Sequence, residues 1–371
     1  MTGGPDAVLV MGEALIDLVP RADDPRTHRA QPGGAPANVA AGLARLGTPS
    51  WFAGALGGDG FARLIEERLV SAGTELGLCA RSGLPTALAV ADPGPDGTGY
   101  HFHLQDTATF RLPERTADVG RFGAVYAGGL AAVVPPAAEA VAATARAGAE
   151  HSVLVVDPNV REDRALDNGS AARRLRELCE LARVLKVSDE DVAALWPGAA
   201  PEETCAHLAA GNRLVVLTRG PAGSTAFTRD LGRVSVPAVR VDVVNTIGAG
   251  DAFMAAVLSW LADAGAFRDG GAARLSRGRA AEMLTFASQV AASVVAQSGT
   301  EPSRPHYDGT PVQAGGAPGL PEAAGGGMRF VLAASAAGCR CPGLRRAWRS
   351  GREPTWVRNG QPIVRRGQGI R

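Results

Sequence analysis

The most informative residues of this chain are Val244-Asn245-Thr246-Ile247-Gly248-Ala249-Gly250-Asp251-Ala252-Phe253. Small residues at 248–250 allow backbone N–H groups to approach a ligand closely, and they precede a predicted helix over 252–261 whose N-terminus favours anions. Asp251 follows this turn directly, so its carboxylate can accept a proton from an attacking hydroxyl while the amides hold a phosphate. Taken alone, the motif is more readily explained as a glycine-rich turn with Asp251 as helix N-cap. The motif therefore needs support from elsewhere in the chain.

The composition limits how phosphate could be held. The chain has 371 residues with 38 Lys+Arg, and Lys186 is the only lysine. A Walker-type loop ends in Gly-Lys-Ser/Thr, and Lys186 follows Val184-Leu185, so that loop is excluded. Glycine is abundant, at 48 residues. If the protein handles phosphate, it does so with backbone amides and arginine.

The chain carries no signal for a membrane or for export. No apolar run reaches the roughly 18 residues of a membrane helix, and the N-terminus lacks the basic start of a secretory signal. Five scattered cysteines suit a reducing compartment. We expect a cytoplasmic protein without a membrane partner.

Charge is divided unevenly along the chain. Residues 306–371 carry ten arginines and three acidic residues, a net charge of +7, which leaves −6 on residues 1–305. We predict one domain over 1–305 and a Gly/Arg-rich tail over 306–371 that is disordered or not native to the fold. An arginine-rich arm on nucleic acid is the alternative for the tail, but no nucleic-acid partner is expected.

Short β-branched runs alternate with helical patterns, which predicts a mainly parallel sheet with helices on both faces. We expect strands at 7–11, 153–156 and 214–217, and helices at 37–46 and 61–71. Two of these strands deliver polar residues at their C-terminal ends, the edge where open α/β sheets bind ligands.

Two further stretches, 14–32 and 85–110, show strand-like alternation with turn residues and no helix between. They predict a small separate sheet, such as a lid.

A second glycine-rich turn enters the predicted helix at 37–46, reading Gly33-Gly34-Ala35-Pro36-Ala37-Asn38. Pro36 suits a first helical turn. Asn38 can both donate and accept hydrogen bonds, as recognition of a polyol requires.

These motifs resemble, in the same order, those of the ribokinase-like (PfkB-type) carbohydrate kinases, and most closely the fructokinases. The resemblance covers 7–305, through segments 12–18, 33–38, 54–61, 157–161, 218–223 and 248–251. It implies a ribokinase-like three-layer α/β/α sandwich with a mainly parallel central sheet and a small β lid. The implied activity is ATP-dependent phosphorylation of a sugar primary hydroxyl, with ATP and Mg²⁺ as cofactors.

The resemblance also implies residue roles. Asp251 would be the catalytic base, beside an anion hole of Gly248, Ala249 and Gly250. The sugar would contact Asp17, Gly33, Gly34, Asn38, Phe102, Gln105 and Arg161. The nucleotide would lie along Ser188, Thr218, Gly220, Pro221, Ala222, Gly223, Ser224, Thr225 and Ser288. Asp191 would act indirectly near Mg²⁺, and Asn245 and Ile247 near a monovalent cation such as K⁺. Asn245 stands where the family usually has Asp, which leaves activation by that cation open.

The substrate and assembly stay open at this point. 2-Keto-3-deoxygluconate kinase, ribokinase and nucleoside kinase are the alternative activities within this family. Arg161 helps to distinguish the first of them from a fructokinase, because a sugar acid needs a cationic pocket. A catalytically weak, sugar-sensing binding module is the alternative from another class. Relatives often dimerise through the lid, so a homodimer is one expectation.

Overall fold

The computed structural model describes residues 3–302 apart from 22, 23, 25, 95, 96, 162–168, 269, 270, 298 and 300, together with 357–358 and 361–362. The chain divides into two units, Met1–Ala334 and Ser335–Arg371. The described residues of the second unit are two antiparallel strands, β15 (Val357–Arg358) and β16 (Gln361–Pro362). The rest of the predicted tail lies outside the described residues.

An eight-stranded sheet forms the centre of the first unit, in the order β14-β13-β12-β11-β10-β9-β1-β4. The six strands from β12 to β4 are parallel, and β13 and β14 continue the sheet in antiparallel fashion. The parallel strands are short apolar runs buried on both faces, as parallel sheets require. The bounds are β1 (Val8–Met11), β4 (Ser50–Ala53), β9 (Ala124–Gly128), β10 (Val153–Asp157), β11 (Val184–Ser188), β12 (Leu214–Thr218), β13 (Ser224–Thr228) and β14 (Gly232–Val236).

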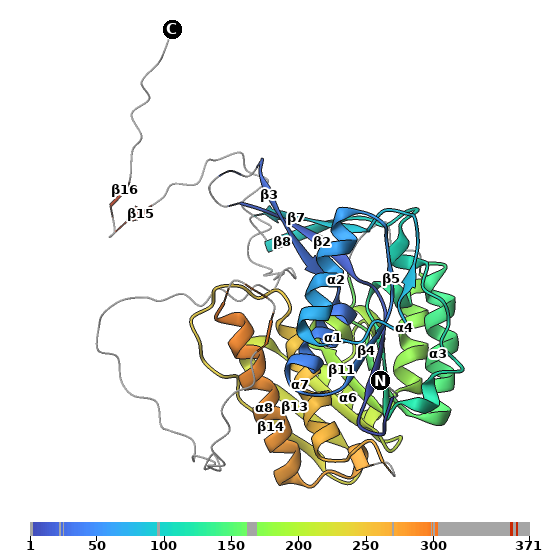
Figure 1. The fold of residues 1–371 in the computed structure, drawn as a ribbon. Helices are drawn as coiled ribbons and strands as arrows, with labels where there is room; N and C mark the ends of the chain where they lie inside the picture. The colour runs from blue at the N-terminus through green and yellow to red at the C-terminus, as the bar shows by residue number, and fades with distance from the viewer. Residues whose placement is uncertain are drawn as a thin grey trace. The chain divides into compact units, whose positions relative to one another are not determined.

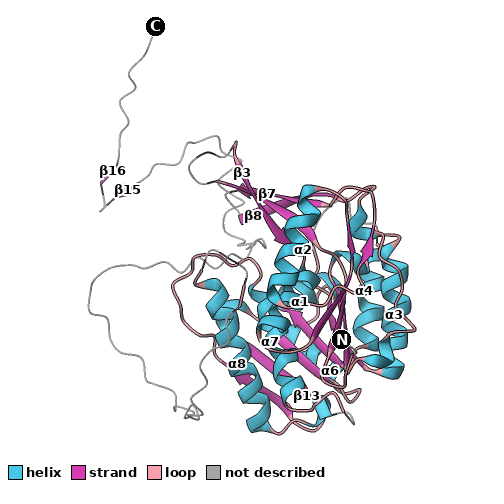
Figure 2. Ribbon diagram, in the orientation of Figure 1, coloured by secondary structure: helices cyan, strands magenta, loops and turns pink. Residues whose placement is uncertain are grey.

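Helices cover both faces of this sheet, so the predicted three-layer sandwich is confirmed (Figures 1 and 2). One face carries α1 (Ala35–Arg45), α2 (Gly60–Ala72), α7 (Ala249–Asp263) and α8 (Arg277–Val295). The other carries α3 (Ala137–His151), α4 (Ser170–Leu181), α5 (Asp189–Leu195) and α6 (Pro201–Ala209). Short 3-10 turns lie at η1 (Ala108–Phe110), η2 (Val119–Arg121), η3 (Leu130–Ala132), η4 (Gly220–Ala222) and η5 (Gly271–Arg274).

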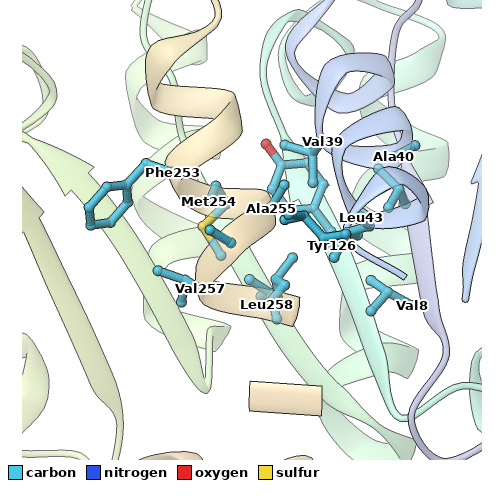
Figure 3. Close-up of a cluster of buried hydrophobic side chains, with 14 of the residues drawn as sticks. Val8, Val39, Ala40, Leu43, Tyr126, Phe253, Met254, Ala255, Val257 and Leu258 are labelled. Atoms are coloured by element: carbon cyan, nitrogen blue, oxygen red, sulfur yellow. The ribbon is translucent and has the colours of Figure 1, made fainter. Parts of the chain in front are cut away.

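Helix α7 is apolar around its whole circumference because it is enclosed by the sheet, α1 and α8. Met254 and Leu258 lie beside Leu43 of α1 and Val8 of β1 in one buried cluster (Figure 3). The strands contribute alternate residues to this cluster, as the two-residue period of a strand dictates. The core therefore fixes α7, and with it the glycine-rich turn from which the helix begins.

A separate four-stranded sheet, in the order β3-β2-β7-β8, is the predicted lid and is called the lid sheet below (Figure 1). Its strands are β2 (Leu15–Pro20), β3 (His28–Gly33), β7 (Leu88–Gly94) and β8 (Gly97–His103). The two predicted stretches pair with each other through β2 and β7, which are parallel. A two-stranded pair, β5 (Ala55–Leu56) and β6 (Ala80–Arg81), completes the strands of this unit. Among the described residues, no helix has the length and apolarity needed to span a membrane.

Candidate active site

Polar residues gather where the parallel strands of the central sheet end. Asp157 is the last residue of β10, Ser188 ends β11 and Thr218 ends β12. Glu13 follows β1 by two residues. Carboxyl ends of parallel strands meet at one sheet edge, so the sequence brings these side chains to the same place.

The first turn of α7 supplies backbone donors at this edge. The helix starts at Ala249, three residues earlier than predicted, and its N-cap is Gly248 in the left-handed region with φ 78°. Asp251 is therefore a first-turn residue, so the interpretation of Asp251 as N-cap is wrong. The Ala249 N–H donates to Thr246 O at 3.3 Å. Among the described hydrogen bonds, the N–H groups of Gly250 and Asp251 have no acceptor, and they fit an anion at the positive end of the helix.

The Asp251 carboxylate is buried and held by two asparagines. Asn38 Nδ2 donates to Asp251 Oδ2 at 2.7 Å, and Asn159 Nδ2 donates to Oδ1 at 3.5 Å. Burial raises the pKa of Asp251, while the Asn38 hydrogen bond and the positive charge of Arg161 oppose this rise. A buried carboxylate with a raised pKa next to available backbone N–H groups provides what a general base beside an anion hole requires.

Lys186 lies beneath the same turn. Its Nζ contacts both carboxylate oxygens of Asp157, at 2.9 and 3.1 Å, and both side chains are buried. A methyl group placed on Gly250 would lie 3.5 Å from this ammonium. Burial raises the pKa of Asp157 to about 6 despite Lys186. Burial opposes the charge of Lys186, but Asp157 and Asp191 outweigh it, so the pKa of Lys186 is raised.

The predicted sugar residues from the N-terminal half meet Asp251. Gly33 lies against Asp17, whose carboxylate occupies the space that a side chain at 33 would fill. Gly34 is the N-cap of α1 with φ 96°, a conformation that favours glycine. Burial, followed by the negative charge of Asp251, raises the pKa of Asp17 to about 6. The structure therefore brings Asp17, Gly33, Gly34 and Asn38 together with Asp251.

The other three predicted sugar residues lie at the exposed side of the site. Phe102 is half-buried in β8 and stacks on Tyr100, with ring centroids 6.1 Å apart. Gln105 is exposed. Arg161 is also exposed, with Nη1 3.4 Å from Val160 O, and its charge lowers the pKa values of Asp17 and Asp251.

Ser188 and Asp191 form a capping box at the start of α5. The Asp191 carboxylate accepts the N–H groups of Ser188 and Val160, each at 2.8 Å. Both of its oxygens thus have backbone partners, so the structure shows a local structural role for this carboxylate. Its indirect role near Mg²⁺ stays a prediction.

The predicted nucleotide residues divide into exposed and enclosed ones. Gly220, Pro221 and Ala222 are exposed, Thr218 is half-buried, and Gly223 is buried with φ 88°. Ser224 and Thr225 point into the structure, and Thr225 Oγ1 contacts Arg219 Nη2 at 3.0 Å and Ser235 Oγ at 2.9 Å. Both side chains thus lie away from the exposed turn at 220–222, and their nucleotide roles stay predictions. Ser288, in α8, retains only 9% of its accessible surface.

The two predicted cation residues form a turn before α7. Asn245 Oδ1 accepts the Ile247 N–H at 3.0 Å, and Asn245 N donates to Val295 O at 3.2 Å. This contact gives the Asn245 oxygen a protein partner, and the cation role stays a prediction.

Five residues of the site were missing from the predicted set, among them Asp157 at the end of β10. Asn159 belongs to the quoted motif at 157–161 and adopts φ 44°, so its position after a strand was a usable signal. Glu13 accepts the N–H groups of Leu130 and Ala131, and burial raises its pKa to about 7. Arg68 carries no motif of its own, and Lys186 lies two residues before the predicted nucleotide residue Ser188. Arg68, on α2, donates to Asn38 Oδ1 at 2.8 Å.

Known proteins resemble this chain in sequence and in fold. The family model described as pfkB family carbohydrate kinase matches residues 6–306. A fructokinase of Rhizobium leguminosarum bv. trifolii is 32% identical over 261 residues, which cover 68% of this chain and 79% of that protein.

Two solved structures are also similar. A fructokinase with bound ATP from Xylella fastidiosa has a TM-score of 0.72 and 27% identity, covering 80% of this chain and 94% of that one. A fructokinase from Vibrio cholerae O395 in fructose-, ADP- and calcium-bound form has a TM-score of 0.69 and 26% identity, covering 79% and 94%. These matches confirm the ribokinase-like fold and an ATP-dependent sugar kinase. The chain belongs to the pfkB family of carbohydrate kinases.

Proposed function

We propose that this kinase phosphorylates a primary hydroxyl of fructose, with Asp251 as the general base and the first-turn amides of α7 as the anion hole. The observation that carries the proposal is the buried Asp251 carboxylate, held at 2.7 Å by Asn38 beside two N–H groups that have no acceptor among the described residues. Fructose is the substrate because the relatives reported above are fructokinases.

The chemistry follows from these positions. The sugar hydroxyl would transfer its proton to Asp251 as its oxygen attacks the terminal phosphorus in line with the leaving oxygen. The N–H groups of Gly250 and Asp251 would stabilise charge that develops on the transferred group, in a site shielded from water. Mg²⁺, when bound with ATP, neutralises part of the phosphate charge. No Walker lysine is needed, because the backbone N–H groups stabilise the charge on the transferred phosphoryl group.

The sugar would lie between the lid sheet and α1. Asp17 and Asn38 supply an acceptor and a donor for hydroxyl groups, and Gly33 leaves room for Asp17. Arg161 is exposed at this site, and a cation there favours 2-keto-3-deoxygluconate as the second candidate, because a sugar acid carries a carboxylate. ATP would lie along the exposed turn at 220–222.

The finer predictions belong to the same proposal. They are K⁺ near Asn245 and Ile247, a homodimer through the lid sheet, a cytoplasmic location and a catalytic domain that ends near residue 305. The K⁺ site, the homodimer and the domain boundary are supported by the family resemblance, and the cytoplasmic location by the few scattered cysteines.

The test is an ADP-release assay with fructose, 2-keto-3-deoxygluconate, ribose and adenosine. We expect highest kcat/KM with fructose, and absence of turnover on all four would favour the sugar-sensing module. In Asp251→Asn, kcat should fall by about 10³-fold or more with the fold intact. Asp263→Asn makes the same chemical change at the exposed far end of α7 and should keep wild-type kcat. Near-wild-type turnover in Asp251→Asn would remove the base assignment.

A further inference from the structure

Arg68 stands out because it is a nearly buried cation on α2 whose charge acts on Asp251. Its side chain retains only 10% of its accessible surface. Nη1 donates to Asn38 Oδ1 at 2.8 Å and to Pro32 O of β3 at 3.3 Å. Its Nε lies 3.9 Å from Glu301 Oε1, in the segment after α8. One guanidinium thus links α1, the lid sheet and the segment that follows α8.

The contact with Asn38 decides which way that amide faces. A guanidinium only donates hydrogen bonds, so the atom of Asn38 that faces Arg68 must be its oxygen. The amide nitrogen then faces Asp251, where Nδ2 lies 2.7 Å from Oδ2. Without Arg68, the amide could rotate and turn its oxygen toward a carboxylate that it would repel.

We propose that Arg68 is a positioning residue for catalysis, which fixes the Asn38 amide so that its N–H group holds the Asp251 carboxylate. The inference rests on the proposed function, in which Asp251 is the base. It adds a residue that makes no contact with the reacting atoms. Glu301 helps to hold Arg68, since it pairs with Arg45 at 2.6 Å and lies beside Arg68.

The charges around Asp251 predict how loss of Arg68 changes its titration. The charged groups whose fields reach Asp251 are the cations Arg161, Lys186 and Arg68 and the carboxylates Asp17 and Asp157. Removing Arg68 removes one cation and loosens the Asn38 hydrogen bond, and both changes raise the pKa of Asp251. A base with a higher pKa is protonated at higher pH, so the acid limb of the pH–rate profile should move upward.

The experiment compares Arg68→Gln with Arg63→Gln, an arginine that is exposed on the same helix. In Arg68→Gln we expect kcat/KM for fructose to fall by about tenfold to a hundredfold. The KM for ATP should stay unchanged, and the acid limb of kcat should rise by roughly half to one pH unit. Arg63→Gln should match wild type in all three quantities. Arg68→Lys keeps the charge but not the planar fork, so it should show an intermediate kcat/KM and a smaller rise of the acid limb than Arg68→Gln.

Each outcome decides the inference. A wild-type acid limb and kcat/KM in folded Arg68→Gln would overturn it, as would equal losses in Arg68→Gln and Arg63→Gln. If Arg68→Gln does not fold, Arg68→Lys alone decides, and wild-type kcat/KM overturns the inference. Asp251→Asn is measured in parallel. An inactive Asp251→Asn with a normal Arg68→Gln rejects only the positioning role, whereas an active Asp251→Asn rejects the proposed base itself.

Discussion

The buried pair of Lys186 and Asp157 yields the sharpest stability prediction. Lys186→Met keeps the length of the side chain and removes the charge, which leaves a fully buried carboxylate without its cation. At 2.9 Å, two unit charges attract by about 6 kcal/mol for an effective dielectric constant of about 20. Breaking a buried pair by removing one partner typically costs about 3–5 kcal/mol. We expect the free energy of unfolding to fall by that amount at pH 8.

Protonation of Asp157 limits this cost. An aspartate with an unfolded-state pKa of 3.8 can be neutralised for about 1.4 kcal/mol per pH unit above that value. The limit is therefore about 6 kcal/mol at pH 8 and about 4 kcal/mol at pH 6.5. In the variant the folded pKa of Asp157 lies above the unfolded one, so the folded state binds the extra proton. The penalty is complete above the folded pKa and decreases as the pH falls through it.

The assay is urea unfolding, followed by tryptophan fluorescence, at pH 8 and pH 6.5. The double variant Asp157→Asn/Lys186→Met should recover most of the loss, because no buried charge remains. Arg173→Gln removes an exposed cation that lies 3.8 Å from Glu177 and should change stability by about 0.5 kcal/mol or less. A Lys186→Met variant within about 1 kcal/mol of wild type at pH 8 would refute the reasoning. A loss at pH 6.5 that exceeds the limit of about 4 kcal/mol would show that Asp157 does not take up the proton.

Three further predictions concern the sugar site and the tail. The pKa of Asp17 is about 6, so the KM for fructose should rise as the pH falls below 6, because a protonated carboxyl group is a poorer hydrogen-bond acceptor. Asp17→Asn should have a high KM for fructose without this pH dependence. A wild-type KM in Asp17→Asn would exclude the contact between Asp17 and the sugar. Gly33→Ala places a methyl group against the Asp17 carboxylate and should raise the KM for fructose by about tenfold or more. The melting temperature of the variant serves as the control for folding. An unchanged KM would contradict the close fit between Gly33 and Asp17. Truncation after residue 305 keeps Glu301 and should leave kcat and melting temperature unchanged, whereas a fall in either would make the tail part of the working enzyme.

Much of the site could be predicted from sequence because its motifs are local. The turn at 248–251 and the turn at 33–38 each form one glycine-rich entry to a helix, and a strand's end places Asp157 at the sheet edge. The start of α7 was placed three residues late, since glycine is a poor helix former and conceals a left-handed N-cap.

The role of Arg68 could not be predicted in this way. Its partners Asn38 and Glu301 lie 30 and 233 residues away along the chain, and an arginine on a helix ordinarily predicts a solvated face. The burial of Lys186 was equally hard to predict, because a lysine is almost never fully buried unless it is paired. Its burial depends on Asp157, which only the parallel pairing of β10 and β11 brings within reach. Tertiary pairing of this kind leaves no local pattern.

Helix α7 has one consequence for how this enzyme would tolerate mutation. Its first turn supplies the amides and Asp251, and the residues that follow, from Ala252 to Leu258, are all buried. One helix thus forms the middle of the core and also carries the catalytic groups. A small tilt of α7, caused by truncating Met254 or Leu258, would displace the amides before the protein unfolds. A library screened by turnover should therefore return core positions on α7 as readily as active-site ones, and such variants would be folded, stable at room temperature and slow.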